Sequence, residues 1–285
     1  MLFFAGSIAF AQNVDSINFV SAKWVKQRVA PKTNIITHHF EEKNLFLANQ
    51  NISYIEIKNK GNAPLFAIGA EAKKLKTAAT IGKENNAIAA INGTFFDVKN
   101  GGSVDFIKVG GKVISTNRLD KNNTRAKHQR AAIVINDGKL NVKKWDGTLN
   151  WEEDLTEKDV MNSGPLLIYN QQVEDLDTAA FNRLRHPRSA IGIKPDGNVI
   201  LLTVDGRNEK SAGLSLFELT KVMKWLGCTN AINLDGGGST TLWVNNAPGN
   251  GIVNYPSDNK KWDHEGARKV ADVILLKDKK TKNKH

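Results

Sequence analysis

Hydrophobic and polar residues alternate along much of the chain in runs of strand length, most clearly over residues 33–47 and 52–58. A period of two places alternate side chains on opposite faces of a strand, so these runs predict strands of an antiparallel sheet. Gly110-Gly111, Asp137-Gly138 and Asp196-Gly197 are typical of hairpin turns. Further strands are expected near residues 65–68, 87–91, 106–109, 132–135, 190–193, 199–204 and 231–234.

Two segments have the composition of helices. Residues 70–81 are dominated by Ala, Lys and Leu, which have high helix propensity. Residues 215–226 carry a fuller signal, because Ser215 and Glu218 form a capping box, apolar residues recur on one face, and Gly227 supplies a C-terminal stop. These patterns predict a β-rich α+β domain with a twisted, largely antiparallel sheet framework and one strand–helix–strand unit.

The strand–helix–strand unit places two aspartates at strand ends. Asp205 follows the apolar run 199–204, Asp235 follows the run 231–234, and glycine comes after each. If the two strands are parallel, a right-handed crossover brings both ends to one sheet edge, roughly 5 to 10 Å apart. Two carboxylates at that separation can divide acid and base roles at a glycosidic bond. The alternative is that each aspartate only forms a turn with its glycine.

A glycine-rich loop, residues 236–241, follows Asp235 directly. A run of three glycines is costly in chain entropy, and successive backbone amides in such a loop can bind a phosphate or another anion. No lysine precedes Ser239 and no GxGxxG occurs, so nucleotide binding is not supported. Arg188 and Arg207 flank the region, and arginine suits bidentate recognition of phosphate. A flexible connector and surface salt bridges are the alternative interpretations.

Composition narrows the remaining function classes. The chain has 285 residues, 40% of them hydrophobic and 24% charged, and shows no internal repeat or linker, which is typical of one soluble domain. Its net charge of +11 fits attraction to an anionic substrate, or basic residues scattered over the surface. No RNA-binding signature occurs, so nucleic acid is not expected as a partner. Cys228 is the one cysteine and the histidines lack zinc-site spacing; no cofactor is implied, and a divalent cation is left open.

The N-terminal residues are apolar from Leu2 to Ala11 and too short to span a bilayer as a helix. Ala9-Phe10-Ala11 before Gln12 matches a signal peptidase site, although the usual positive start is missing. We therefore expect residues 1–11 to be a signal peptide, possibly truncated, and residues 12–285 to be the exported domain. A buried N-terminal strand is the alternative. Export predicts a periplasmic or extracellular protein without stable membrane insertion.

Several ordered segments resemble the phosphodiester glycosidase family, over roughly residues 70–276. The DGGGST element is the most specific of them. The segments are INLDGGGSTTLWV (232–244), RSAIGI (188–193), VDGR (204–207), GLSLFEL (213–219), AAINGTFFD (89–97), NSGPLL (162–167) and NYPSD (254–258).

The resemblance implies an exported or lumenal enzyme that acts on a glycosidic bond to a phosphate, on a β-rich α+β domain. It also implies site residues at the matched positions. The candidates for catalysis are Asp235, Asp205, Asn92 and Asp97. The candidates for substrate or phosphate binding are Arg188, Arg207, Ser163, Gly236, Gly237, Ser239 and Thr240.

The combined hypothesis is hydrolysis of a sugar-1-phosphodiester, of the N-acetylglucosamine-1-phosphate type, in a glycan or cell-envelope polymer. Free sugar and a phosphomonoester would be released. Two alternatives stay open: an ordinary glycoside hydrolase acting on glycans without phosphate, and a non-catalytic glycan-binding protein of the same fold. The sequence leaves the oligomeric state open.

Overall fold

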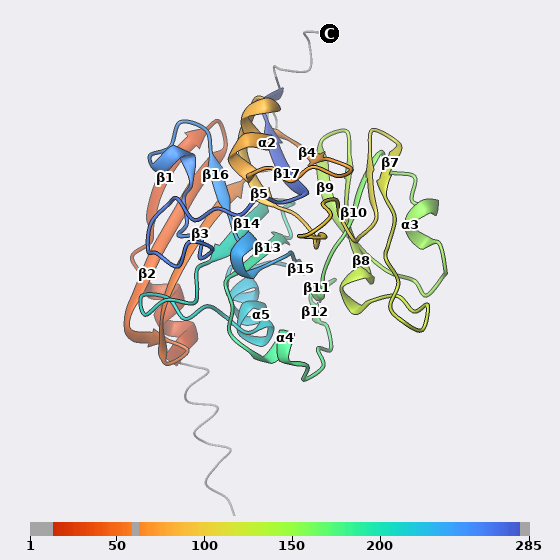
Figure 1. The fold of residues 1–285 in the computed structure, drawn as a ribbon. Helices are drawn as coiled ribbons and strands as arrows, with labels where there is room; N and C mark the ends of the chain where they lie inside the picture. Colours follow the sequence, from red (N-terminus) through yellow and green to blue (C-terminus); the bar gives the residue numbers. More distant parts are fainter. Residues whose placement is uncertain (1–13, 59–62, 280–285) are drawn as a thin grey trace, which may run out of the picture.

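The computed structural model describes residues 14–58 and 63–279 (Figure 1), so the predicted signal peptide lies outside the described residues. Within them, three sheets form, and every strand pairing in them is antiparallel. The predicted β-rich, antiparallel α+β fold is confirmed. The helices are short and lie on the outside of the sheets (Figure 1).

The largest sheet has eight strands. Their order is β1 (Val25–Ala30), β2 (Thr33–Leu45), β3 (Ala48–Ile57), β14 (Val199–Val204), β13 (Arg188–Ile193), β15 (Asn230–Asn233), β11 (Leu166–Tyr169) and β12 (Gln172–Val173).

Two smaller sheets pack beside it. The five-stranded sheet has the order β7 (Lys112–Ser115), β6 (Ile107–Val109), β10 (Asp159–Asn162), β8 (Ala131–Asn136) and β9 (Lys139–Lys144). The four-stranded sheet has the order β16 (Leu242–Val244), β5 (Ala87–Asn92), β17 (Asp272–Lys277) and β4 (Leu65–Ala70). The helices are residues 14–21, α2 (Ala78–Glu84), α3 (Trp151–Asp154), α4 (Ala180–Arg183) and α5 (Leu216–Trp225), with 3₁₀ turns at Lys127–Gln129, Gly237–Ser239 and Gly249–Gly251.

The main core lies between the three sheets. It brings together Ile55 of β3, Ile91 of β5 and Ile133 of β8, which are all fully buried. The other face of the eight-stranded sheet is covered by α5, so that Ile200 and Leu202 of β14 pack beneath that helix. Strand β14 is therefore buried on both faces, which explains why it is an unbroken apolar run rather than an alternating one.

The predicted helix at residues 215–226 is confirmed as α5. The Ser215 hydroxyl accepts a hydrogen bond from the Glu218 amide at 3.2 Å, and the Glu218 carboxylate accepts one from the Ser215 amide at 2.8 Å. Gly227 adopts a φ of +81°, the left-handed conformation that ends a helix at little cost to glycine. Beneath the helix, Cys228 is buried, and burial raises the pKa of its thiol to about 12.

The predicted helix at residues 70–81 is wrong over its first two thirds. Ala70 ends β4, and Lys76 pairs with Val270 as an isolated bridge. Helix α2 begins only after Thr77, whose hydroxyl accepts a hydrogen bond from the Thr80 amide. Helix propensity is a weak preference, and here backbone pairing with a distant segment outweighs it.

The sheet order decides how the two predicted site strands meet. Strands β14 and β15 run in the same direction, but β13 lies between them and is antiparallel to both. Asp205 and Asp235 therefore emerge at one sheet edge, two strand spacings or roughly 10 Å apart. Arg188 begins β13 at this same edge, opposite Val204.

The four-stranded sheet is joined to this edge through Gly93. Its carbonyl accepts a hydrogen bond from the Asp235 amide at 3.0 Å, and its own amide donates to the Asp272 carbonyl at 3.0 Å. The edge that carries the aspartates thus lies where the sheets meet. Among the described helices, none has the length and apolar character needed to cross a membrane.

Candidate active site

Asp235 lies at the centre of this junction and is a partly exposed residue. One carboxylate oxygen accepts a hydrogen bond from the Gly236 amide at 2.9 Å. The pKa of Asp235 is raised to about 6. Burial is the largest cause and the negative charge of Asp105 adds to it, while the Ser239 hydroxyl, the Gly236 amide and the Arg268 charge oppose it. A carboxyl group with this pKa can exchange a proton near neutral pH.

The glycines after Asp235 are required by close contacts. A Cβ at Gly236 would lie 2.6 Å from the Pro187 carbonyl oxygen, and one at Gly238 would lie 2.5 Å from the Arg268 guanidinium. Gly237 has a φ of +60°, and a Cβ there would lie 2.9 Å from Arg207 Nη2. No other residue type fits this loop without displacing its neighbours.

The loop amides are mostly engaged inside the protein. The Gly236 amide donates to Asp235, the Gly237 amide to Pro187, the Ser239 amide to Gly236 and the Thr240 amide to Gly237. These four donors are not available to an anion, in contrast to the predicted amide site for phosphate. The positive groups beside the loop are instead the guanidinium groups that touch its glycines.

Asn92 holds the backbone on which Asp235 is carried. Its side-chain amide donates to the Asp235 carbonyl at 2.7 Å, and its oxygen accepts from the Ser189 hydroxyl at 2.6 Å and the Thr241 amide at 3.1 Å. Ser163 is also fully buried and donates to the Asn233 carbonyl at 3.2 Å. Asn92 and Ser163 lie close to the site but use their polar atoms on the protein itself.

Asp205 is completely enclosed. Its carboxylate accepts hydrogen bonds from the Asn51 amide at 2.8 Å, from the Asn254 amide at 2.9 Å and from the Tyr255 backbone at 2.9 Å. Burial raises its pKa, and the three donors lower it. With 1% of its surface exposed, this carboxylate joins β14 to β3 and to the segment around Asn254.

The two predicted arginines differ sharply in their surroundings. Arg188 is buried and donates to the backbone carbonyls of Phe181, Leu184 and Leu214 at 2.6 to 3.0 Å, and burial lowers its pKa to about 10. Arg207 is exposed and has a φ of +62°, which is uncommon outside glycine. Such backbone strain is typical of functional sites.

Asp97 lies at the edge of the junction and forms a turn. It accepts hydrogen bonds from the amides of Lys99 and Asn100 and from the Asn100 side chain, and it pairs with Arg118 at 3.1 Å. These bonds, led by that to Asn100, hold the pKa of Asp97 well below its usual range. Its geometry is that of a loop-stabilising carboxylate.

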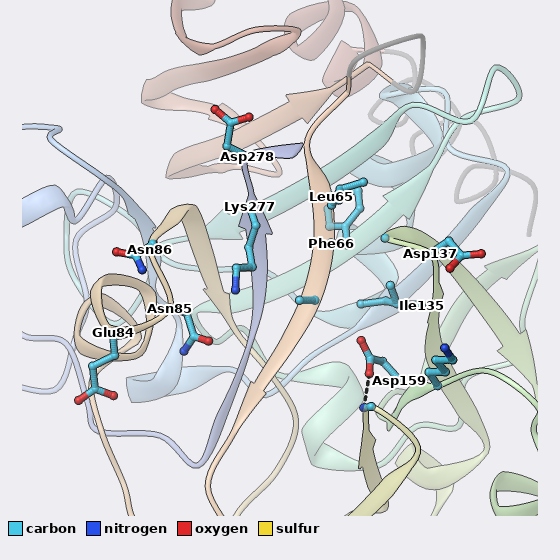
Figure 2. Close-up of a pocket in the computed structure, with 14 residues that line it drawn as sticks. Leu65, Phe66, Glu84, Asn85, Asn86, Ile135, Asp137, Asp159, Lys277 and Asp278 are labelled. Atoms are coloured by element: carbon cyan, nitrogen blue, oxygen red, sulfur yellow. Dashed lines mark hydrogen bonds between the residues drawn. The ribbon is translucent and has the colours of Figure 1, made fainter. Parts of the chain in front are cut away.

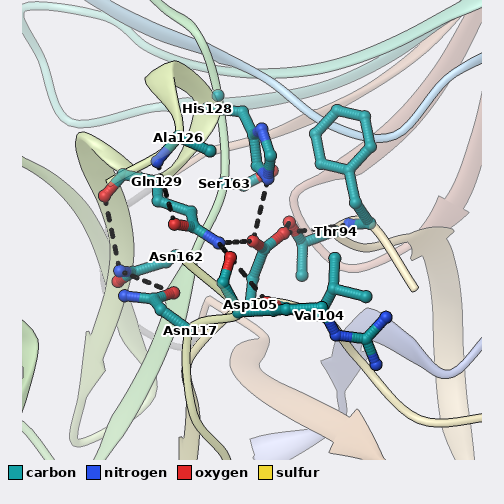
Figure 3. A network of polar contacts seen from close by, with 12 residues as sticks. Thr94, Val104, Asp105, Asn117, Ala126, His128, Gln129, Asn162 and Ser163 are labelled. Carbon is teal, nitrogen blue, oxygen red and sulfur yellow. Dashed lines mark hydrogen bonds and ion pairs between the residues drawn. The ribbon is translucent and has the colours of Figure 1, made fainter. Parts of the chain in front are cut away.

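A buried network around Asp105 was not predicted from the sequence (Figure 3). The Asp105 carboxylate accepts hydrogen bonds from the Thr94 hydroxyl at 2.7 Å and from the Gln129 amide at 2.8 Å, and it contacts His128 Nε2 at 2.9 Å. The His128 ring is partly exposed and packs against the Phe95 ring, with 4.4 Å between the centroids. An imidazole oriented by a buried carboxylate is a common proton-transfer arrangement.

Asp272 and Arg268 are two further residues near the site that were not among the candidates predicted from the sequence. Asp272 is fully buried; one of its oxygens accepts from the Thr94 amide at 2.7 Å, and the other has no partner among the described residues. Burial raises its pKa well above the ordinary value, and the charges of Asp105 and Asp235 add to this. Arg268 contacts Gly238 and pairs with Asp258 at 2.5 Å.

A signal for Asp272 did exist in the sequence. It begins the apolar run 272–277, so it mirrors the aspartates that end such runs, and antiparallel pairing brings the start of β17 to the end of β5. Asp105 lies in a loop and His128 in a single 3₁₀ turn, neither with a periodic pattern, and only tertiary contacts bring them together. Within the described ranges, no group of three or more His, Cys, Asp or Glu residues is arranged to hold a metal ion.

The cavities near the junction are of moderate size. One of about 230 Å³ is lined by Phe95, His128 and Phe181, and one of about 300 Å³ includes Arg207. A larger cavity of about 570 Å³ lies away from the junction, between the edge of β4 and the five-stranded sheet (Figure 2). It contains none of the residues described above, so volume alone does not locate the site.

Comparison with known proteins identifies the family. The sequence profile of the phosphodiester glycosidases matches residues 85–277, and the chain belongs to this family. The motif-based resemblance is thereby confirmed. Bovine N-acetylglucosamine-1-phosphodiester alpha-N-acetylglucosaminidase is 28% identical over 220 residues, which cover 73% of this chain and 40% of the bovine protein.

A bacterial protein is similar over part of the same region. The uncharacterized protein YomE, derived from the SPbeta prophage of Bacillus subtilis, is 28% identical over 175 residues, covering 59% of this chain and 26% of YomE. The chain therefore spans about a quarter to two fifths of the length of these two relatives.

Solved structures show the same fold. The catalytic domain of the zebrafish N-acetylglucosamine-1-phosphodiester alpha-N-acetylglucosaminidase, auto-inhibited by its pro-peptide, aligns with a TM-score of 0.63 at 19% identity, covering 94% of this chain and 92% of that domain. A hypothetical protein from Synechocystis aligns with a TM-score of 0.64 at 15% identity, covering 90% of this chain and 64% of that protein.

Proposed function

We propose that this protein hydrolyses a sugar-1-phosphodiester, of the N-acetylglucosamine-1-phosphate type, within a glycan or cell-envelope polymer. The observation that carries the proposal is Asp235: a partly exposed residue whose carboxyl has a pKa of about 6, followed by a glycine loop that Arg207 and Arg268 touch. The name of the bovine relative, which describes action on such a diester, supports this substrate class.

The chemistry follows from the leaving group. The bond between C1 of the sugar and the phosphate oxygen breaks, its electron pair stays on that oxygen, and a water molecule supplies the hydroxyl at C1. A phosphomonoester is a stable anion, so it needs little protonation by an acid. With a pKa of about 6, Asp235 is about 90% ionised at pH 7. It can therefore accept the proton of the water or attack C1 as a nucleophile.

The surrounding residues fit the two halves of the substrate. Arg207 lies against the loop, and its guanidinium suits the non-bridging oxygens of the phosphate. The cavity lined by Phe95, His128 and Phe181 offers a partly apolar surface for the sugar ring. Arg188, whose Cζ lies 4.8 Å from the Phe181 ring centroid, connects this cavity to the glycine loop. Asp205 and Asn92 act in this scheme as positioning residues.

A substrate panel tests the proposal. The purified protein would be incubated with a GlcNAc-phosphoryl-mannose diester, with an aryl N-acetylglucosaminide, and with a neutral GlcNAc oligomer. Release of free GlcNAc from the diester alone supports a phosphodiester glycosidase. Cleavage of the aryl glycoside and the neutral oligomer, with the diester intact, supports an ordinary glycoside hydrolase. Binding without turnover supports a glycan-binding protein and would refute the proposal.

We further propose that the protein acts outside the cytoplasm, because the apolar start and Ala9-Phe10-Ala11 match an export signal. Cleavage is expected before Gln12. N-terminal sequencing of the protein recovered from its native host checks this, and an intact Met1 on cytoplasmic protein would contradict it.

A further inference from the structure

A second cavity adjoins the Asp235 loop on the side of Arg207. Its volume is about 300 Å³, and its walls are residues 206–208 and parts of residues 255–262. Arg207 contacts both the cavity and the glycine loop, because it lines the cavity while its Nη2 lies against Gly237. We call this cavity the Arg207 pocket. A ligand held at Arg207 can therefore extend from the Asp235 site into it.

The Arg207 pocket is built on the same framework as the catalytic loop. Its wall residue Tyr255 donates its backbone amide to the buried carboxylate of Asp205 at 2.9 Å. Another wall residue, Asp258, accepts hydrogen bonds from Arg268 at 2.5 and 3.0 Å, and Arg268 touches Gly238. These contacts connect the pocket to the loop, one through the buried carboxylate of Asp205 and one through the more exposed pair of Asp258 and Arg268.

The charge of the pocket is positive. Arg207, Lys260 and Lys261 line it and are exposed. The acidic group among the lining residues, Asp258, is already paired with Arg268. In addition, the hydroxyl of the lining residue Ser257 is buried and has no hydrogen-bond partner among the described residues. Three exposed cations are suited to an anion such as a phosphate, and the unpaired Ser257 hydroxyl lies in the same wall.

Two aromatic residues, Tyr255 and Trp262, also line the pocket. The rings of Tyr255 and Trp262 stack with centroids 4.2 Å apart and an angle of 5° between their planes. His264 packs on Tyr255, and Lys210 lies 6.0 Å from the Trp262 ring. Stacked rings give a carbon-rich surface that can contact the body of a polyol or sugar next to a phosphate.

We propose that the Arg207 pocket is a subsite for a second phosphate, so that the preferred substrate is a polyanionic polymer with phosphodiester-linked repeats. This inference rests on the proposed function. The Asp235 site would hold the diester that is cleaved, and the pocket would hold the phosphate of the adjoining repeat. The two lysines raise affinity for the polymer and take no part in the bond cleavage.

The test compares two substrates and two matched variants. The substrates are a single GlcNAc-1-phosphodiester and an oligomer that carries the same diester next to further glycerol phosphate units. Lys260→Gln combined with Lys261→Gln removes two charges of the pocket. Lys112→Gln combined with Lys121→Gln removes two exposed charges from the region of the five-stranded sheet and serves as the control.

We expect the wild-type protein to have a higher kcat/KM on the oligomer than on the single diester. The Lys260/Lys261 variant should lose about tenfold of kcat/KM on the oligomer through KM, with less than a twofold change on the single diester. The control variant should keep the oligomer preference. An unchanged preference in the Lys260/Lys261 variant, or an equal loss in the control, would overturn the subsite.

A binding measurement separates this inference from the proposed function. A glycerol phosphate hexamer without any sugar should bind the wild-type protein about tenfold more tightly than the Lys260/Lys261 variant, and the difference should shrink at high salt. Failure of the wild type to hydrolyse either diester would refute the proposed function. Equal hexamer affinity of wild type and variant would refute the pocket by itself.

Discussion

Asp205 and Asp235 have the same local sequence, an apolar strand followed by aspartate and glycine. They differ in burial and in the number of hydrogen bonds that they accept. Asp205 is fully buried and accepts three hydrogen bonds from protein donors. Asp235 is partly exposed and accepts one backbone hydrogen bond beside two arginines. The two strands even share one sheet edge, separated by β13.

The difference lies in what covers each strand end. The segment around Asn254 folds over Asp205 and supplies two of its three donors. The residues after Asp235 are glycines, which have no side chains to cover it and let the guanidinium groups of Arg207 and Arg268 approach. A buried carboxylate with all its donors in place stabilises the fold, whereas one with spare acceptor capacity can act on a ligand.

The largest expected effect comes from removing the Asp205 carboxylate. Asp205→Ala leaves the Asn51, Asn254 and Tyr255 donors without their acceptor, so the free energy of unfolding should fall by about 3 to 5 kcal/mol. Urea denaturation checks this value. A loss below about 1 kcal/mol, together with a large loss of kcat, would reverse the comparison and place Asp205 in the chemistry.

Asp235→Asn should leave the fold intact and strongly lower the turnover. Removal of the ionisable group is expected to lower kcat by a hundredfold or more on a sugar-1-phosphodiester. In the wild type, kcat should rise with pH through about 6, because the ionised carboxylate is the active form. A stable variant with near-normal turnover would remove Asp235 from the mechanism.

Arg207 and Arg188 differ in the same way as the two aspartates, one exposed and one buried. Arg207→Lys keeps the charge but loses the bidentate fork, so kcat/KM on the diester should fall about tenfold with little change in melting temperature. Arg188→Lys should instead lower the melting temperature, because lysine cannot reach the three carbonyl partners of Arg188 together. Equal losses for Arg207→Lys on a diester and on a neutral glycoside would argue against phosphate binding.

The smallest expected effect is a pH-dependent gain in stability. The folded-state pKa of Asp235, about 6, lies above its ordinary value, so ionising this carboxyl destabilises the folded protein as pH rises from about 4 to 6. Asp235→Asn removes that cost and should be more stable than the wild type at pH 7.5, by at most about 3 kcal/mol, which is the value of a shift of about two pKa units. Below pH 4 the two should be equally stable. A variant less stable than wild type at pH 7.5 would indicate a structural carboxylate.

The sequence by itself determined the local features of the molecule. Alternating runs predicted most of the strands, and the capping box at Ser215 predicted α5, because these signals depend on residues close in the chain. The motifs around Asp235 and Arg188 also indicated the family. The helix predicted at residues 70–81 failed because its first residues pair with the distant segment at Val270.

Only the tertiary structure decided which candidates face a ligand. Asp205 and Arg188 are as prominent in the sequence as Asp235 and Arg207, yet the first two are enclosed by distant backbone groups. Asp105 and His128 come together across a loop and were not predictable. The burial of a side chain, its hydrogen-bond partners and its pKa all depend on contacts between residues far apart in the chain. Local sequence patterns cannot predict those contacts.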